Sequence, residues 1–176
     1  MKLTKIKPQF LKKHNPRIGL ITLSSDFRIE KDFNDVIHGK NIDLFSNRIQ
    51  SYNPLTNENL KKMAENITKV TKDILPDQKL DCVAYGCTSG TIASGYDSIF
   101  EKINIAKPNT KVTTPITSAI KAIKVLKINK LSIFTPYTNE INQSLINYFK
   151  KENIEADELF YFDIKSDLDI GKVDPD

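Results

Sequence analysis

Continuous apolar runs recur along the chain, and polar segments separate them. The run at residues 17–23, for example, is followed by Ser24–Asp26, which is the pattern of a buried parallel strand that ends in a polar loop. We expect strands at residues 17–23, 42–50, 80–85, 131–135 and 155–162, and a short one at Val112.

A second pattern, with apolar residues every three or four positions, predicts helices between these strands. The clearest example follows Thr56, a residue type that caps helices, and Pro76 ends it. Its apolar face comprises Leu60, Met63, Ala64, Ile67, Val70 and Ile74. Further helices are expected after residues 17–23, over 89–103, from the Thr114–Pro115 pair onward and over 138–151. Because strands and helices alternate, we expect an α/β fold with a largely parallel sheet.

Small polar residues follow a buried strand at similar places in the two halves of the chain. Residues 85–89 read Y-G-C-T-S, and residues 134–138 read F-T-P-Y-T. In an open α/β sheet, ligands bind to loops at the carboxyl ends of the strands. We therefore expect both loops, together with Ser24–Asp26, to lie at one edge of the fold and to form a site there.

Composition narrows the class of protein. The chain has 176 residues, of which 39% are hydrophobic and 27% charged, and this is enough for a normal core in one domain or in two small halves. No apolar run reaches the roughly 20 residues of a membrane span, and the N-terminus lacks the apolar region of a signal peptide. We expect a cytoplasmic protein.

The formal net charge of +4 comes from the N-terminal end. Residues 1–17 carry six lysines and arginines and no acid, whereas residues 155–176 carry eight acids and two lysines. A lysine-rich terminal arm of this kind is usually solvated, and nucleic-acid surfaces more often place arginines and aromatics on a folded element. Nucleic-acid binding is therefore not expected.

The two cysteines lie in the stretch LDCVAYGCTSGT and have different surroundings. Cys82 falls inside an apolar strand, where a thiol behaves as a small apolar group. Cys87 falls between a strand end and a helix start, where backbone N–H groups favour the thiolate. With only His14 and His38 in addition, the chain cannot supply a four-ligand zinc site, so no metal is expected.

The residues after Cys87 indicate which chemistry its thiol could perform. Thr88, Ser89 and Gly90 offer hydroxyls and amides that suit a carboxylate. A thiol beside a carboxylate pocket indicates proton transfer next to an acid, or attack on an unsaturated diacid. Two rival cysteine chemistries fit less well, because a phosphatase loop C-x5-R would need arginine where Ala93 stands, and no redox C-x-x-C motif is present.

Four further polar residues are candidates for substrate contacts, and each has a structural alternative. Tyr137 could donate its phenol to a bound carboxylate, or cap the core. Arg48 could pair with a carboxylate, or form a surface salt bridge. Asp26 is either a substrate contact or a helix cap, and Asn142 either points at the same pocket or faces solvent.

Four segments carry a resemblance to a known family. In this order and spacing, SSDFRIEKDF, NRIQSYNPLTNENL, YGCTSGT and TPYTNEINQ resemble the ectoine-utilisation EutA proteins, which belong with maleate cis-trans isomerases and arylmalonate decarboxylases in the aspartate/glutamate racemase superfamily. The resemblance runs from Arg17 to Asp176. It implies two pseudo-symmetric Rossmann-like α/β halves, which we place at residues 17–112 and 113–176 after a basic arm at 1–16, with an active site between them.

The resemblance also implies residue roles and a reaction. Cys87 resembles the catalytic thiol of the first half, Thr88 and Ser89 its carboxylate binders, and Tyr137 and Asn142 second-half substrate contacts. Asp26 stands where maleate isomerases of this group have a substrate-binding asparagine, which argues against maleate itself. The implied enzyme is cofactor-independent, and its family members commonly self-associate into homo-oligomers.

The family's second Cys-Thr motif would be expected downstream of Val173–Asp176. We therefore expect the chain to be a fragment whose second half is incomplete, and two-base racemisation to need a thiol that it does not contain. The leading hypothesis is an isomerase that transfers a proton at or beside the α-carbon of a small carboxylic or amino acid in ectoine breakdown. The alternatives are covalent cis-trans isomerisation of maleate type and a non-catalytic module that binds a small acid.

Overall fold

The computed structural model describes residues 1–174 and confirms the predicted α/β class. Four parallel strands form the first sheet in the order β2-β1-β3-β4. They are β1 (Arg17–Leu23), β2 (Asp43–Ile49), β3 (Cys82–Tyr85) and β4 (Lys111–Thr113). Two further parallel strands, β5 (Lys130–Thr135) and β6 (Glu155–Tyr161), form a second sheet. The last two residues of the predicted second half, 175 and 176, lie outside the described residues, and the division at residues 112 and 113 stays a prediction.

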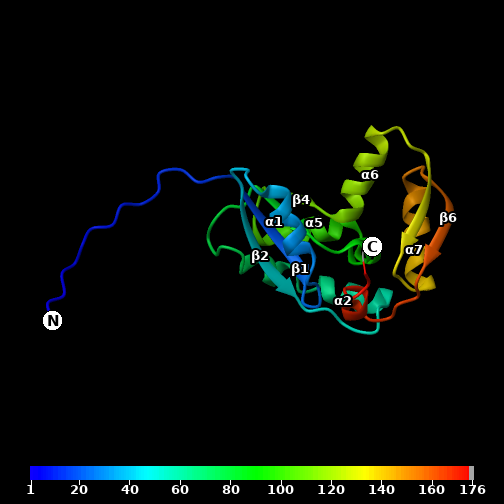
Figure 1. Ribbon diagram of the computed structural model, residues 1–176, viewed down its shortest axis with the longest axis horizontal. Coiled ribbons are helices and arrows are strands. Elements are labelled where there is room, and N and C mark those ends of the chain that lie inside the picture. Colours follow the sequence, from blue (N-terminus) through cyan, green and yellow to red (C-terminus); the bar gives the residue numbers. More distant parts are fainter. Residues whose placement is uncertain (175–176) are drawn as a thin grey trace.

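Helices connect the strands in both sheets. They are α1 (Ile29–Ile37), α2 (Asn57–Ala64), α3 (Ile67–Lys72), α4 (Thr88–Ser94), α5 (Tyr96–Ala106), α6 (Pro115–Val125), α7 (Asn139–Lys151) and α8 (Asp167–Ile170). In Figure 1 the first sheet lies at one end of the folded part and β6 with α7 at the other, and α6 leads from the first sheet toward the second. Two layered α/β units therefore lie next to each other.

Local capping explains where two of these helices begin. The Thr56 side chain accepts a hydrogen bond from Asn59 N at the start of α2. Thr114 and Thr117 form a reciprocal capping box at the start of α6, with Pro115 at its first position. Both helix starts were predicted from these residue types, because a capping side chain satisfies a backbone N–H that has no partner within the helix.

Two long helices predicted from the apolar pattern are each divided in the structure. The segment after Thr56 is interrupted at Glu65 and Asn66, between α2 and α3. The segment at 89–103 is interrupted at Gly95, whose φ of +80° no helix can contain. Of the six apolar positions predicted to face the core after Thr56, five are buried and Val70 is partly buried. Apolar spacing continues through a short kink and therefore does not report it.

The core of the first unit lies between its sheet and α2 to α5. Ile21, Ile49, Ile67, Val83 and Ile99 are fully buried there. A second cluster of buried residues packs α6 and α7 against β5 and includes Ile120, Leu145 and Phe149. The other face of the second sheet stays open, because Phe134, Phe160 and Phe162 are each about half or more exposed. The rings of Phe134 and Phe162 meet edge to face, with 4.8 Å between their centroids.

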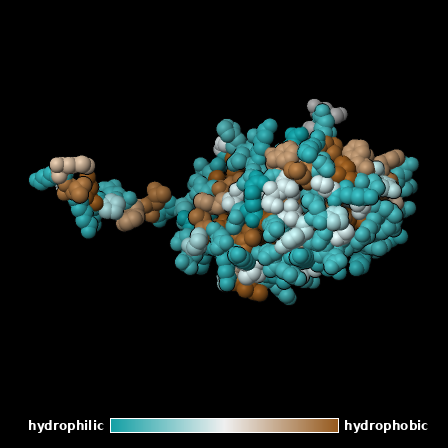
Figure 2. Space-filling view, turned by 90° about the horizontal axis from the view of Figure 1, so that it is seen from below, coloured by the Kyte–Doolittle hydropathy of each residue, from teal (hydrophilic) through white to brown (hydrophobic). Residues whose placement is uncertain are grey.

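The basic arm contains no helix or strand and extends away from the folded part (Figure 1). Figure 2 shows that apolar side chains lie along this arm among its charged ones, and they include the exposed Leu3, Ile6, Phe10 and Leu11. Within residues 1–174, none of the helices has the length and apolar character needed to cross a membrane.

Candidate active site

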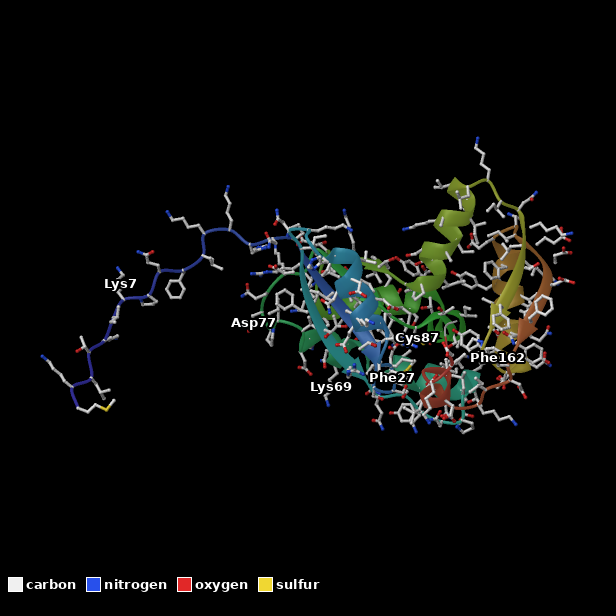
Figure 3. The ribbon with its side chains drawn as sticks, in the orientation of Figure 1. Lys7, Phe27, Lys69, Asp77, Cys87 and Phe162 are labelled. Atoms are coloured by element: carbon white, nitrogen blue, oxygen red, sulfur yellow. The ribbon has the colours of Figure 1, made fainter. Side chains whose placement is uncertain are left out.

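Loops that follow three parallel strands meet around one cavity of about 510 Å³. Ser25 and Asp26 come from the loop after β1, Gly86 to Ser89 from the segment after β3, and Tyr137 from the loop after β5. Helix α8 adds a further wall. The predicted meeting of these loops at one edge of the fold is therefore observed, and Figure 3 shows Cys87 in the interior of the folded part, toward this edge.

Cys87 is the residue that precedes α4, and its sulfur caps that helix. The Sγ atom accepts a hydrogen bond from Gly90 N at 3.2 Å and lies 3.7 Å from Ser89 Oγ. The residue is only 4% exposed. Burial raises the pKa of the thiol to about 11, and the Gly90 N–H and the Ser89 hydroxyl offset only part of this rise. The prediction that this position favours the thiolate is therefore wrong, because desolvation outweighs the helix start.

Gly90 leaves the space that the thiol occupies. A Cβ atom at Gly90 would lie 2.6 Å from Tyr85 Oη, 2.9 Å from Cys87 Sγ and 3.0 Å from Met63 Cε. Contacts below 3.0 Å between such atoms require a shift of the neighbours. Glycine at this position therefore allows the phenol of Tyr85 and the thiol of Cys87 to approach the same turn of α4.

Tyr85 is a site residue that the sequence analysis missed. It is fully buried, and its hydroxyl has no hydrogen-bond partner among the described residues. Burial, and then the neighbouring Cys87, raise the pKa of this phenol well above its usual value, so it stays protonated. It can therefore donate to the sulfur when Cys87 ionises. No signal in the sequence marks this role, since a tyrosine that ends an apolar run has the pattern of a core residue.

Thr88 and Ser89 both line the cavity next to the thiol, and their role as carboxylate binders stays a prediction. Ser89 is 4% exposed, and its hydroxyl lies 3.7 Å from the sulfur of Cys87. Two hydroxyls beside one thiol can donate to an anion that enters the cavity.

Tyr137 lines the same cavity, and Asn142 fixes its backbone. Asn142 Nδ2 donates to the Tyr137 carbonyl at 3.2 Å, and Asn142 Oδ1 accepts from the Thr135 hydroxyl at 2.7 Å. Tyr137 N in turn donates to Thr135 Oγ1 at 3.3 Å. Asn142 is 1% exposed, so it neither faces solvent nor lines the cavity but holds the loop that does. Burial raises the pKa of Tyr137, which keeps its phenol a donor.

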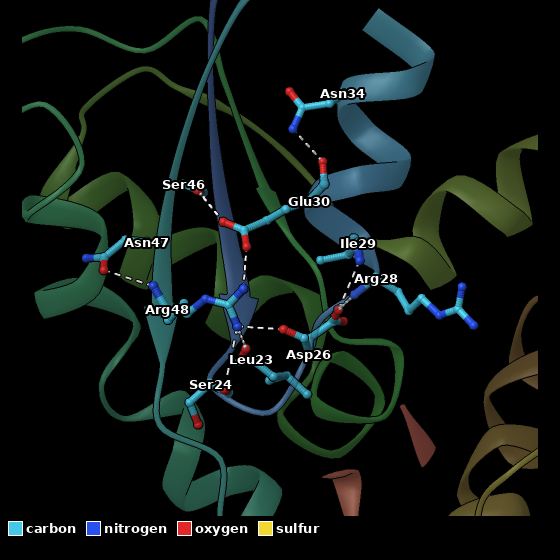
Figure 4. Close-up of polar contacts among 10 residues, drawn as sticks. All are labelled: Leu23, Ser24, Asp26, Arg28, Ile29, Glu30, Asn34, Ser46, Asn47 and Arg48. Atoms are coloured by element: carbon cyan, nitrogen blue, oxygen red, sulfur yellow. Dashed lines mark hydrogen bonds and ion pairs between the residues drawn. The ribbon is translucent and has the colours of Figure 1, made fainter. Parts of the chain in front are cut away.

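Asp26 acts as a helix cap and also lines the cavity, whereas its contact with a substrate stays a prediction. Its Oδ1 atom accepts from Arg28 N at 2.7 Å and from Ile29 N at 2.9 Å, which caps the start of α1. The same side chain lines the cavity. Figure 4 shows Asp26 between the start of α1 and the side chain of Arg48.

Arg48 lies behind this loop and outside the cavity lining. Its guanidinium donates to the carbonyls of Leu23 at 3.2 Å and Asp26 at 2.5 Å, and it forms an ion pair with Glu30 (Figure 4). The surface salt bridge, one of the two alternatives for this residue, is therefore present. Because the same guanidinium holds two carbonyls of the loop that carries Asp26, Arg48 braces the cavity wall from outside.

Asp167, the first residue of α8, lines the cavity, and the sequence analysis did not single it out. Its carboxylate forms no hydrogen bond or ion pair with the described residues, and the backbone N donates to Asn53 Oδ1 at 3.3 Å. Partial burial, and then the nearby carboxylate of Asp26, raise the pKa of Asp167. In the sequence it is one of many acids near the C-terminus, so charge pattern alone could not identify it.

Cys82 lies apart from this site. It is the first residue of β3 and half-buried, and burial raises the pKa of its thiol. It does not line the cavity, which agrees with a structural role. Across residues 1–174, no three histidine, cysteine, aspartate or glutamate side chains gather as a metal site would require.

Comparisons with known proteins place the fold. No protein-family model matches the chain, and no curated protein sequence matches it. Among solved structures it is similar to the maleate isomerase Iso from Pseudomonas putida S16, with 21% identity over 91% of this chain and 69% of that one and a TM-score of 0.79. A Nocardia farcinica maleate cis-trans isomerase mutant with a covalently bound succinylcysteine intermediate matches with 16% identity over 90% and 68%, also at 0.79.

A liganded mutant of arylmalonate decarboxylase is a third similar structure, with 15% identity over 85% of this chain and 63% of that one and a TM-score of 0.69. At these identities the likeness concerns the fold. The chain therefore has the fold of the maleate isomerases and arylmalonate decarboxylases, and the implied membership of the EutA proteins stays a prediction.

Proposed function

We propose that this chain belongs to a cofactor-independent enzyme in which Cys87 transfers a proton at or beside the α-carbon of a small carboxylate. The observation that carries the proposal is a buried thiol at the wall of a cavity, with a backbone N–H and a serine hydroxyl directed at its sulfur. A thiol in this setting can accept or donate a proton reversibly, because the same donors stabilise the thiolate when it forms.

The proton path follows from the raised pKa of Cys87. The resting group is the thiol, so Cys87 must lose its proton to solvent before it can act as a base. The Gly90 N–H and the Tyr85 hydroxyl stabilise the thiolate that forms. The thiolate then removes the α-proton: an S–H bond forms, and the C–H electron pair stays on the α-carbon as an enolate-like carbanion. In the reverse direction the thiol returns its proton to that carbon, and the S–H electron pair stays on sulfur. Thr88, Ser89 and Tyr137 bind the carboxylate and stabilise the charge that develops on it.

The biological setting of the proposal is ectoine breakdown, and it rests on the resemblance of four sequence segments to the EutA proteins. A cytoplasmic location and self-association belong to the same expectation.

Solvent exchange tests the assigned role of Cys87. In deuterium oxide, the protein should incorporate deuterium at the α-carbon of its substrate, read by proton nuclear magnetic resonance over a panel of small carboxylic and amino acids. Cys87→Ala should abolish exchange, and Cys82→Ala, which changes the other thiol, should retain it. Exchange that persists in Cys87→Ala would contradict the assignment.

A second candidate is covalent cis-trans isomerisation, which is favoured by the succinylcysteine intermediate in one structure of the same fold. Here the thiolate of Cys87 would add to the double bond of an unsaturated diacid, the new single bond would rotate, and expulsion of the thiolate would restore the double bond. Incubation with maleate should then give a succinyl-type adduct on Cys87 in intact-mass and peptide spectra. Failure of maleate to protect this thiol from alkylation would count against it.

A further inference from the structure

The charged side chains around the cavity are unequal in sign. Asp26, Asp32 and Asp167 contribute three carboxylates to the lining, and Arg28 contributes one guanidinium. An anionic wall disfavours a ligand that brings two more negative charges and favours one that brings a positive charge. The acidic wall therefore selects among ligands that carry one carboxylate for Thr88 and Ser89. It favours those whose other charged group is positive.

Asp167 is the carboxylate most available to a ligand. Its carboxylate oxygens accept no hydrogen bond and have no ion-pair partner among residues 1–174. Its backbone is held in place, because Asp167 N donates to Asn53 Oδ1 and the nearby Lys165 carbonyl accepts from Leu55 N at 2.8 Å. A ligand that supplies a cation stabilises a partly buried carboxylate that is fixed in place and unpaired.

Asp26 strengthens the preference of this wall for a cationic group. One of its oxygens accepts hydrogen bonds from Arg28 N and Ile29 N at the start of α1, and these two bonds fix the orientation of the side chain. Asp26 lies close enough to Asp167 to raise the pKa of that carboxyl. Two neighbouring carboxylates on one wall repel each other, and a cation placed beside both relieves this repulsion.

We propose that the ligand of this cavity is a small amino acid whose ammonium group lies beside Asp167 and Asp26, while its carboxylate binds the hydroxyls of Thr88 and Ser89. This inference rests on the proposed function, since it names the substrate class of the same site. It distinguishes the protein from one that would bind a dicarboxylate such as maleate, because a second carboxylate would meet the acidic wall.

Three probes with four carbons separate these classes. Succinate carries a second carboxylate, whereas 2-aminobutyrate and 4-aminobutyrate each carry one carboxylate and one ammonium group at different distances. Binding to the full chain is measured by isothermal titration calorimetry, and protection of Cys87 from iodoacetamide is measured in parallel by peptide mass spectrometry. We expect at least one aminobutyrate to bind about tenfold or more tightly than succinate, which corresponds to about 1.4 kcal/mol.

Charge-neutral variants identify the source of the preference. Asp167→Asn should reduce the preference about tenfold, mainly because succinate binds more tightly and the aminobutyrate less tightly. The matched control is Asp169→Asn on the same helix, since Asp169 pairs with Lys172 at the surface and does not line the cavity. It should leave the preference unchanged.

Three outcomes would contradict the inference, and they differ in what else they affect. Tighter binding of succinate than of either aminobutyrate would overturn the substrate class and leave the proposed proton transfer standing. An unchanged preference in Asp167→Asn would overturn the assignment to this wall. Absence of binding and of Cys87 protection by all three probes would overturn the inference together with the proposed function.

Discussion

Removal of the Tyr85 hydroxyl, in Tyr85→Phe, separates thiol ionisation from fold stability. Burial raises the pKa of Cys87 to about 11, so only about one thiol in a thousand is ionised at pH 8. The Tyr85 hydroxyl is fully buried and has no hydrogen-bond partner within residues 1–174, so it is available to donate to the thiolate. A hydrogen bond to a charged group contributes about 1.5–3 kcal/mol, which corresponds to about one to two pKa units.

The variant should therefore react more slowly while it folds as well as before. We expect the iodoacetamide reaction of Cys87 at pH 9 to slow about 10- to 100-fold, measured by peptide mass spectrometry from pH 7 to 11 in a Cys82→Ser background. The free energy of unfolding should stay equal or rise by about 1 kcal/mol, because the variant removes a buried group that lacks a partner. Tyr148→Phe, which changes a tyrosine outside the cavity lining, is the control.

Two results would refute this reasoning. An unchanged alkylation rate in Tyr85→Phe would show that the phenol does not stabilise the thiolate. A rate in the unsubstituted Tyr85 protein that already levels off below pH 9 would show that burial does not control the ionisation of Cys87.

The remaining predictions concern the supports of the site. Gly90→Ala should gain up to about 1 kcal/mol in the free energy of unfolding from helix propensity and lose about 1–3 kcal/mol from overpacking against Tyr85 and Cys87. Urea unfolding should show a net loss of stability, and equal stability would contradict the crowding at this position. Asn142→Leu leaves the Tyr137 carbonyl without its buried donor and should lower the free energy of unfolding by about 2–3 kcal/mol, whereas an unchanged urea midpoint would contradict its bracing role. Arg48→Ala should lower the free energy of unfolding by only about 1 kcal/mol, because the side chain is 41% exposed. It should nevertheless speed amide hydrogen exchange over residues 23–29, and unchanged exchange there would contradict the role of Arg48 in holding this loop. Between pH 9 and 11 the unfolded chain loses the Cys87 proton before the folded chain does. The free energy of unfolding should therefore fall with rising pH by up to about 2–3 kcal/mol more than it does in Cys87→Ala. Parallel curves of stability against pH for the two proteins would contradict this.

The sequence identified those parts of the site that depend on local order. Cys87, Thr88 and Ser89 follow a strand directly, and Tyr137 follows another, so parallel topology alone brings them to one edge. Thr56 and Thr114 likewise predict the starts of the helices that they cap.

What the sequence did not identify depends on contacts over long separations or on burial. Asp167 reaches the cavity because α8 is fixed by Asn53, more than a hundred positions earlier in the chain. The Tyr85 hydroxyl matters because it is buried without a partner, and an apolar pattern cannot report that. The raised pKa of Cys87 similarly reflects the exclusion of water, which outweighs the favourable helix start that the sequence does show.

The open aromatic face of the β5–β6 sheet has a practical consequence for these measurements. Environment-sensitive dyes such as ANS bind exposed apolar surface, and Phe134, Phe160 and Phe162 offer such a surface in the native state. A dye of this kind should fluoresce before any denaturant is added, so its signal would not report unfolding simply. Since the chain contains no tryptophan, far-ultraviolet circular dichroism is the appropriate probe of its stability.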